Sequence, residues 1–216
     1  MPASTKRTKA SRPRDAEATR QRVLLAAKTE FAHNGLSGGR VDAIAKRAKA
    51  NKQMIYHYFG SKKALYLRVL EEAYRDIRIA EAGLELDHLD PVEALKVLVV
   101  FTWDYYLQNP EFLALVTTEN LHRAAHLKKS KVIPELHGPF RARVADILQR
   151  GVKEKRFRPG VDADQLNLTI AAVGYYYLTN RHTNSIIYDA DLIAPNALQR
   201  RLAFNIETIL RVVQAN

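Results

Sequence analysis

The sequence contains no cysteine, and its 216 residues include only 9 glycines and 8 prolines. Without cysteine the chain has no disulfide framework, no thiolate nucleophile and no zinc site built on sulfur ligands. The few glycines and prolines stand where helices are expected to begin or end, and no segment alternates apolar and polar residues with period two. These absences exclude disulfide-rich and all-β classes and predict an all-α fold of about nine helices.

Long hydrophobic runs are also missing. The longest run near the N-terminus covers residues 23–27, and the longest run elsewhere covers residues 97–101. The first is too short for the core of a signal peptide, and the second is far below the ~20 residues of a membrane-spanning helix. We therefore expect a soluble, cytoplasmic protein that has no membrane partner.

Positive charge is concentrated in one block of the chain. Residues 1–63 hold 15 Lys or Arg against 4 Asp or Glu, whereas residues 64–216 hold 19 of each sign. The whole net charge of +11 therefore lies in the first 63 residues. A basic block on an otherwise balanced chain is typical of proteins that bind the phosphates of nucleic acid.

Apolar periodicity and capping residues predict where the helices lie. Asp90-Pro91 and Asn109-Pro110 each place proline at a first helical position, and Pro195 opens the last helix. Gly138-Pro139 is expected to break or kink the helix that contains it. The predicted helices cover residues 14–34, 41–48, 52–59, 62–85, 91–107, 110–127, 132–155, 162 or 164 to 180, and 195–213.

These elements predict three parts of the chain. Residues 1–13 are polar and basic without apolar periodicity, which favours a flexible basic arm. Residues 14–60 form a three-helix DNA-binding domain with a helix-turn-helix, and residues 61–216 form a larger helical domain for ligand binding and dimerisation.

The helices at 41–48 and 52–59 have the pattern of a helix-turn-helix. Small Ala45 stands where the two helices meet, and Asn51 is an N-cap type of residue before the second helix. That second helix is expected to lie in the major groove, with its first residues at the base edges. Lys52 suits guanine and Gln53 suits adenine. The residues predicted to contact DNA are Arg40, Lys49, Lys52, Gln53, Tyr56, His57 and Lys62.

Residues 20–74 resemble the DNA-binding domain of the TetR family of transcriptional regulators. The resemblance is carried by Phe31, Gly35, the segment Val41-x-x-Ile44-Ala45-x-x-Ala48 and the segment Ile55-Tyr56-His57-Tyr58-Phe59-x-Ser61-Lys62, followed by Leu65. It implies a homodimer with a ligand-binding C-terminal domain. It also implies phosphate contacts at Tyr56, His57 and Lys62, and approach to the bases at Lys52 and Gln53.

The sequence departs from the family pattern at two positions. Gly39 stands where the family usually has Thr or Ser, and Lys49 stands where it usually has Gly in the turn. If Lys49 is left-handed, it costs on the order of 1 kcal/mol relative to glycine. Lys49 then either adds a phosphate contact or marks a different turn.

The helix predicted at 110–127 suggests an effector pocket. Its residues Phe112, Leu115, Val116, Glu119, His122, Arg123 and His126 are expected on one face, which begins apolar and ends ionisable. The residues expected to bind an effector are Trp103, Tyr106, Glu119, Arg123, Asn180 and His182. The alternative is that the polar end of this face is solvated, with Glu119 and Arg123 as a surface pair.

Glu119, His122 and His126 also have a spacing that suits a divalent metal, but solvated histidines are the simpler interpretation. We therefore predict no metal and no cofactor.

A dimer interface is expected on the last two helices. Ala171 and Gly174 allow a close approach, and the apolar stripe of the final helix repeats at helical spacing, so two copies would form a four-helix interface. The alternative is that these faces pack within one subunit. The residues predicted at the interface are Ala171, Gly174, Leu198, Leu202, Ile206 and Ile209.

Together these observations predict a homodimeric regulator that binds a near-palindromic operator in double-stranded DNA. We expect a repressor, although the same geometry activates transcription at a differently placed operator. An unknown small-molecule effector in the C-terminal domain relieves or modulates that binding. The alternative is an effector-independent or architectural DNA-binding protein. An enzyme is not expected, because the sequence has no glycine-rich phosphate loop, no Gly-x-Ser-x-Gly and no cysteine nucleophile.

Overall fold

A computed structural model describes residues 11–215 of the chain. These residues form ten α-helices, one short 3₁₀ helix and no β-strand, so the prediction of an all-α fold is confirmed. No helix among them is both long enough and apolar enough to cross a lipid bilayer. The elements are α1 (Ser11–Gly38), α2 (Val41–Ala48), α3 (Lys52–Phe59), α4 (Lys62–Ala82), α5 (Pro91–Gln108), α6 (Pro110–Leu121), η1 (Leu127–Lys129), α7 (Val132–Lys153), α8 (Ala163–Thr179), α9 (Arg181–Ile187) and α10 (Pro195–Val213).

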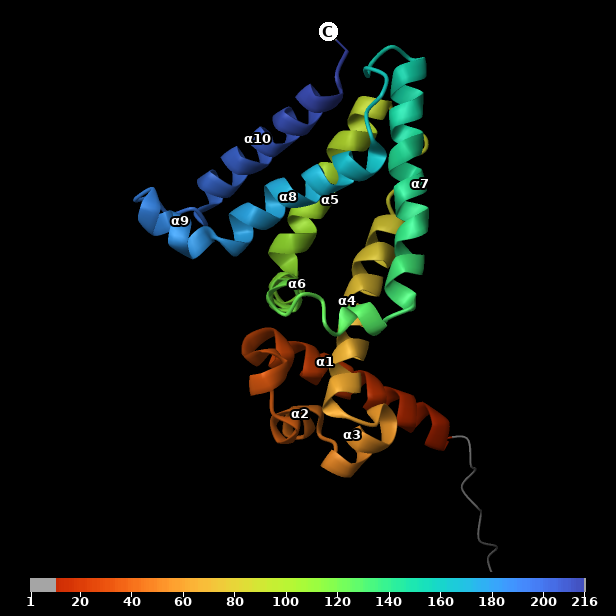
Figure 1. The fold of residues 1–216 in the computed structure, drawn as a ribbon, viewed down its shortest axis with the longest axis vertical. Helices are drawn as coiled ribbons and strands as arrows, with labels where there is room; N and C mark the ends of the chain where they lie inside the picture. The colour runs from red at the N-terminus through yellow and green to blue at the C-terminus, as the bar shows by residue number, and fades with distance from the viewer. Residues whose placement is uncertain (1–10, 216) are drawn as a thin grey trace, which may run out of the picture. The chain divides into compact units, whose positions relative to one another are not determined.

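The chain divides into two compact units within α4 (Figure 1). The N-terminal unit ends at Leu70 and the C-terminal unit begins at Glu71, whereas the sequence places the domain boundary after residue 60. Helix α1 begins at Ser11, inside the range predicted as a basic arm. The rest of that predicted arm, residues 1–10, lies outside the described residues.

The N-terminal unit packs α1, α2, α3 and the start of α4 around a small apolar core (Figure 1). Phe31 of α1 meets Tyr66 of α4 edge to face, with ring centroids 5.2 Å apart. Gly35 has φ of 62°, which kinks α1 at the position where the sequence predicts its end. The buried side chains of this unit include Val23, Ala27, Phe31, Ile44, Ala48, Ile55, Leu65 and Tyr66.

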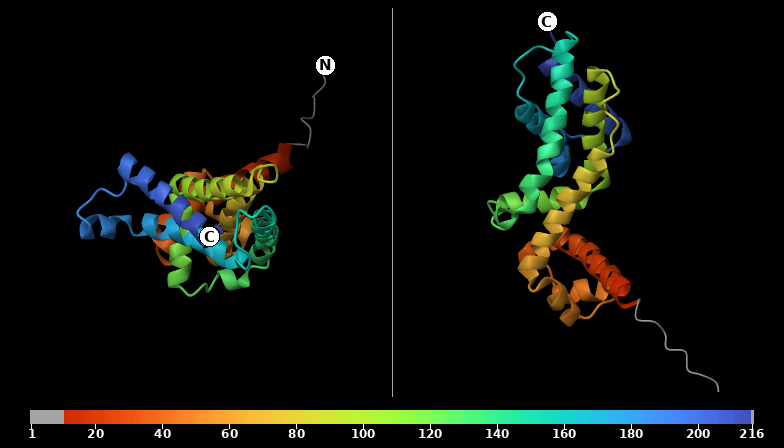
Figure 2. Two further views of the ribbon diagram at one scale, coloured as in Figure 1. Left: turned by 90° about the horizontal axis from the view of Figure 1, so that it is seen from above. Right: turned by 90° about the vertical axis from the view of Figure 1, so that its right-hand side faces the viewer.

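In the C-terminal unit, α5 packs against α7, α8 and α10, while α9 connects α8 to α10 (Figures 1 and 2). The core between these helices is almost wholly aliphatic. Leu95 and Leu98 of α5, Ile147 of α7 and Ile209 of α10 are among its most deeply buried members. This core holds α5 and α8 in place beside the cavity described below.

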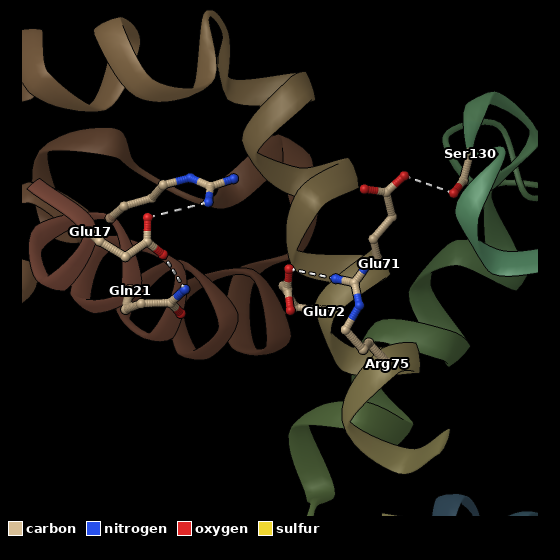
Figure 3. A network of polar contacts seen from close by, with 7 residues as sticks. Glu17, Gln21, Glu71, Glu72, Arg75 and Ser130 are labelled. Atoms are coloured by element: carbon tan, nitrogen blue, oxygen red, sulfur yellow. Dashed lines mark hydrogen bonds and ion pairs between the residues drawn. The ribbon is translucent and has the colours of Figure 1, made fainter. Parts of the chain in front are cut away.

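Local side-chain caps start several of these helices where the sequence predicts. The Asp90 carboxylate accepts the backbone N–H of Val92 at 2.9 Å, and Asp162 accepts those of Asp164 and Gln165. Helix α7 begins differently, because Ser130 Oγ donates to Glu71 Oε1 at 2.8 Å (Figure 3). The same Oγ accepts N–H groups from the first turn of α7.

Three predicted features of the helices were wrong. Helix α6 ends at Leu121 instead of residue 127, because Arg123 and Ala124 both have φ of 56°. Helix α7 continues through Gly138 and Pro139 as one helix, so the predicted break does not occur there. A short helix, α9, lies where the sequence predicts only a loop.

Candidate DNA-reading surface and effector cavity

The turn between α2 and α3 is closed by backbone hydrogen bonds and a side-chain cap. Lys49 is left-handed, with φ of 51° and ψ of 42°, and the N–H of Ala50 donates to the carbonyl of Ala45 at 3.0 Å. Asn51 then accepts the N–H of Met54 at 3.1 Å and starts α3. A helix-turn-helix with these contacts presents α3 in one fixed orientation relative to α2.

Helix α3 has one buried and one exposed side. Ile55 is buried in the core of the unit, whereas Lys52, Gln53 and His57 are exposed and Tyr56 is 41% exposed. Donors and a planar amide therefore project from the side of α3 that faces away from the core, as a helix that reads a DNA groove requires.

Lys52, the first residue of α3, is held by an acidic residue of α2. Its Nζ lies 3.0 Å from Asp42 Oδ1, and the hydrogen bond and charge of Asp42 raise the pKa of Lys52. Both side chains are exposed, so this pair is accessible to an approaching phosphate or base. The contact with Asp42 therefore competes with the predicted contact of Lys52 to DNA.

The other two basic residues predicted to contact DNA flank the helix-turn-helix. Arg40 is the N-cap of α2; its side chain is exposed, and its backbone N–H donates to the buried carboxylate of Glu30 at 3.0 Å. Lys62 opens α4, where its Nζ donates to the carbonyl of Ser37 at 3.2 Å. Ser61 caps α4 by accepting the N–H of Ala64.

The residues around position 39 leave no space for a side chain, which explains the glycine there. A Cβ placed there would lie 2.7 Å from Cδ1 of Phe31 and 2.9 Å from the carbonyl oxygen of Gly35. Thr or Ser, the usual residues of the resembled family, would therefore displace the Phe31 ring.

The C-terminal unit contains a cavity of about 420 Å³ between α4, α5, α6, α7 and α8, hereafter the α4–α8 cavity. Its volume lies in the range of small-molecule sites. Aromatic rings form much of its wall: Tyr106 and Phe112 are stacked with centroids 6.1 Å apart, and Tyr74 meets Phe112 edge to face at 5.5 Å. The lining residues are Tyr74, Ile77, Arg78, Glu81, Thr102, Tyr106, Phe112, Val116, Asn120, His137, Asn167, Leu168, Ala171, Ala172 and Tyr175.

Two charged residues of α4, the half-buried Arg78 and the buried Glu81, line this cavity. Arg78 Nη1 lies 2.9 Å from Glu81 Oε2, and the guanidinium also lies 4.3 Å from the centre of the Phe140 ring. Burial lowers the pKa of Arg78 and raises the pKa of Glu81 to about 7, against the opposing charges of Arg78 and Arg143. The pair therefore places two ionisable groups in a wall that is otherwise made of aromatic, apolar and neutral polar side chains.

The carboxylate of Glu119 closes the loop after α6. It accepts the backbone N–H groups of His126 at 2.7 Å and Leu127 at 2.9 Å, and it contacts His126 Nδ1 at 3.1 Å. Burial raises the pKa of Glu119, but these donors outweigh burial and lower it overall. Over residues 11–215, no group of three His, Asp or Glu side chains is arranged to hold a metal ion.

Each of the two units matches a known family model. Residues 23–69 match the family model of bacterial regulatory proteins of the tetR family, and residues 91–209 match that of the tetracyclin repressor-like C-terminal domain. The HTH-type transcriptional repressor NicS of Pseudomonas putida is 40% identical over 200 residues, which cover 93% of this chain and 94% of that protein. The chain belongs to the TetR family of transcriptional regulators.

Further relatives agree with this membership. The HTH-type transcriptional repressor SCO4008 of Streptomyces coelicolor is 36% identical over 140 residues, covering 64% of this chain and 69% of that protein. The solved structure of SCO4942 from the same species superposes with a TM-score of 0.66 at 26% identity, over 90% of this chain and 98% of that one. This TetR-family protein is therefore a DNA-binding regulator and not an enzyme.

Of the residues predicted to bind an effector in this TetR-family regulator, only one lines the cavity. Tyr106 lines the α4–α8 cavity, whereas Trp103 is buried behind it with its ring 5.7 Å from that of Tyr177. Glu119 is engaged by the loop described above, and Arg123 is exposed beyond the end of α6. Asn180 and His182 lie at the start of α9, outside the cavity lining.

Two of the residues predicted for dimerisation are buried within the subunit. Ile209 is fully buried in the aliphatic core, and Gly174 packs on α5, where an added Cβ would lie 3.4 Å from the Tyr106 ring. Ala171 lines the cavity. Leu198, Leu202 and Ile206 are half-buried. A different apolar stripe is open to solvent: Leu168 and Tyr176 of α8 are each 60% exposed and Phe204 of α10 is 58% exposed.

Sequence analysis missed the contributions of α4 and α7 to the cavity. Tyr74, Arg78 and Glu81 follow one another at helical spacing, next to the apolar stripe that packs α4 into the core. A run of ionisable residues beside an apolar stripe was a signal present in the sequence. His137 of α7 offered no such signal, because only packing brings it to Tyr74, with ring centroids 5.8 Å apart.

Proposed function

We propose that this regulator represses transcription by binding a near-palindromic operator as a homodimer, and that a small molecule in the α4–α8 cavity modulates that binding. A bacterial operator lies in the cytoplasm, where we place the protein. The observation that carries DNA recognition is the exposed side of α3, with Lys52, Gln53, Tyr56 and His57, on a capped helix-turn-helix within the basic block. Arg40, Lys49 and Lys62 extend the basic surface, and phosphate contacts from them would position α3.

The exposed apolar stripe supports the homodimer. Leu168, Tyr176 and Phe204 lie on α8 and α10, which are neighbouring helices of one unit (Figure 1). Two copies that bring these helices together would bury the stripe in a four-helix interface. We replace the interface predicted from sequence with this stripe, because Ile209 and Gly174 are already occupied within one subunit.

Helix α4 supports the link between ligand and DNA. Its first turns place Leu65 and Tyr66 in the core of the N-terminal unit, and its last turns place Tyr74, Arg78 and Glu81 in the cavity wall. A ligand that shifts the end of α4 therefore acts on the same helix that supports the helix-turn-helix. Linkage then requires that a ligand which weakens operator binding itself binds less tightly to the DNA complex.

Selection of bound duplexes from a random DNA pool tests the proposal. The full chain should enrich a palindrome whose half-sites lie about one duplex turn apart or somewhat more. Tyr56→Phe removes one hydroxyl from the exposed side of α3 and should weaken binding to all sequences about equally. Gln53→Ala should instead relax the sequence preference. Salt-dependent binding with no enriched palindrome would refute the operator proposal and favour an architectural protein.

A sedimentation measurement tests the dimer separately. Tyr176→Arg places a charge in the exposed stripe and should give a monomer, whereas Tyr188→Arg, a similarly exposed tyrosine outside α8 and α10, should not. A monomeric wild-type chain at micromolar concentration would contradict the homodimer.

A further inference from the structure

The charges that line the α4–α8 cavity balance each other. Arg78 Nη1 lies 2.9 Å from Glu81 Oε2, and among the described residues of the lining there is no other Lys, Arg, Asp or Glu. Burial raises the pKa of Glu81 to about 7, so above that pH the carboxyl is ionised and the pair has no net charge. A charged ligand would lose its hydration here without meeting an unpaired countercharge, which is costly.

His137, a further ionisable residue of the lining, is neutral as well. Its Nδ1 contacts the carbonyl of Ile133 at 2.9 Å, and a carbonyl only accepts, so this nitrogen carries the proton. Burial lowers the pKa of His137, which favours the neutral ring. Its Nε2 is therefore left as an acceptor.

Tyrosine hydroxyls provide donors in the same wall. Burial raises the pKa of Tyr106 to about 12, and the smaller effects of Tyr74 and Tyr175 on this pKa indicate that their hydroxyls lie nearby. Tyr106 is only 7% exposed, yet its hydroxyl makes no hydrogen bond to any other described residue, and neither does that of Tyr74. Burial also raises the pKa of Tyr74, so both hydroxyls stay protonated and can donate.

Tyr175 adds an acceptor beside these donors. Its hydroxyl oxygen lies 2.7 Å from Thr117 Oγ1, and Thr117 donates its single hydroxyl proton to the carbonyl of Leu113 at 2.8 Å. Tyr175 must therefore donate to Thr117, and its own oxygen remains able to accept. With Nε2 of His137, the wall offers acceptors as well as donors, all on neutral groups.

The aromatic rings of the wall suit a planar ligand. Tyr106 and Phe112 are stacked with centroids 6.1 Å apart, and Tyr74 meets Phe112 edge to face at 5.5 Å. Ring faces and edges of this kind are favourable partners for another aromatic ring.

We infer that the α4–α8 cavity takes a neutral aromatic ligand that carries a carbonyl acceptor beside an N–H donor, as an aromatic amide or lactam does. The ligand carbonyl accepts from the hydroxyl of Tyr74 or Tyr106. The ligand N–H donates to Tyr175 or His137, and the ring packs on the aromatic side chains of the wall. This inference rests on the proposed effector function and deepens it by naming the chemical class of the ligand.

Three probes of nearly equal shape separate neutral from charged ligands by calorimetry on the full chain at pH 8, without DNA. They are 2-naphthamide, 2-naphthoate and 2-naphthylmethylammonium. The amide should bind about ten- to a hundredfold more tightly than either charged probe. A charged probe that binds as tightly as the amide would overturn the inference but leave the cavity as an effector site. No binding of any probe up to about 1 mM would overturn both.

Glu81→Gln tests the charge balance directly. It leaves the charge of Arg78 without its partner, so the affinity for 2-naphthoate relative to the amide should rise about tenfold or more. Glu85→Gln is the matched control, because Glu85 is exposed and does not line the cavity. An unchanged preference in Glu81→Gln would contradict the role of the pair.

Tyr74→Phe and Tyr106→Phe test the donor hydroxyls. At least one of them should weaken binding of the amide about three- to tenfold, because a buried hydrogen bond is lost. Tyr188→Phe, at an exposed tyrosine outside the cavity lining, should not. Binding as tight as in the wild type in both variants would refute these hydrogen bonds. None of these measurements contains DNA, so their failure is distinguishable from failure of operator binding.

Discussion

Lys52 Nζ lies 3.0 Å from Asp42 Oδ1, so an acidic residue of α2 holds the first basic residue of the helix expected to read DNA. The pair reduces the positive charge that α3 offers to phosphate and restricts where Lys52 reaches. Asp42 is thus expected to weaken binding to arbitrary DNA and to leave Lys52 for sites that compete successfully with the carboxylate.

Substitution of Asp42 by Asn should strengthen binding to random-sequence duplex by a few fold and steepen the logarithmic salt dependence by up to about one. The reason is the release of one lysine to phosphate. Fluorescence anisotropy over a salt series measures both quantities. Asp87→Asn is the charge-matched control, because Asp87 is exposed in the C-terminal unit. An equal change in the control would show that only net charge matters.

The left-handed turn at Lys49 predicts a stabilising substitution. Lys49→Gly should raise the free energy of unfolding by about 1 kcal/mol, because glycine adopts φ of 51° without the steric penalty of a side chain. Urea denaturation followed by circular dichroism measures the change. Lys46→Gly, within the regular part of α2, should instead lower stability by about 0.5–1 kcal/mol. A destabilised Lys49→Gly variant would show that the lysine side chain makes an important contact.

The N-terminal unit was more predictable from sequence than the C-terminal unit. Its helix bounds at 41–48 and 52–59 agree with prediction because local features set them, such as the Asn51 cap and the positive φ of Gly60. The same holds for Asp90 and Asp162, whose carboxylates cap helices from two or three residues away. Hydrogen bonds of this kind join residues close together in the sequence, so they can be predicted from it.

Glu119 provides a test of the loop that ended α6 early. Glu119→Gln should lower the free energy of unfolding by about 1–3 kcal/mol, because an amide accepts the three donors less well than a carboxylate. Since the pKa of Glu119 is lowered on folding, its stabilisation is present above the ordinary value of 4.5 and is lost as pH falls through the folded value. Denaturation between neutral and acid pH measures this, with exposed Glu85→Gln as control. An unchanged stability would show that the loop needs no charge.

The end of α6 and the positions of Trp103 and His137 relative to the cavity could not be predicted from sequence, for a shared reason. The carboxylate of Glu119 captures N–H groups seven and eight residues later, so a hydrogen bond across a loop overrides the helical pattern. Trp103 is of a residue type common in binding pockets, yet it is buried and does not line the cavity. His137 lines the cavity from α7. Such placements are decided by packing between helices, which periodicity alone does not specify.

We expect Glu81 to make stability depend on pH in the direction opposite to that of Glu119. Its pKa rises from 4.5 to about 7 on folding, so its contribution to stability is fully present below about 4.5 and is lost as pH rises through about 7. The loss amounts to roughly 3 kcal/mol. Glu81→Gln should therefore gain stability relative to the wild type between pH 4.5 and 8, as measured by urea midpoints. A constant difference over that range would show that Arg78 keeps Glu81 ionised throughout.

Helix α8 contributes residues both to the cavity lining and to the exposed apolar stripe, which matters for the design of a sensor from this regulator. Leu168 and Ala172 both line the cavity and are exposed, and Leu168 also belongs to the exposed apolar stripe. Under the proposed function, a library that randomises Leu168 would alter ligand preference and subunit assembly at once, and a reporter screen would not separate the two effects. Tyr74 and His137 line the cavity and lie outside that stripe, so under the same proposal they are the positions at which ligand preference would change without subunit assembly.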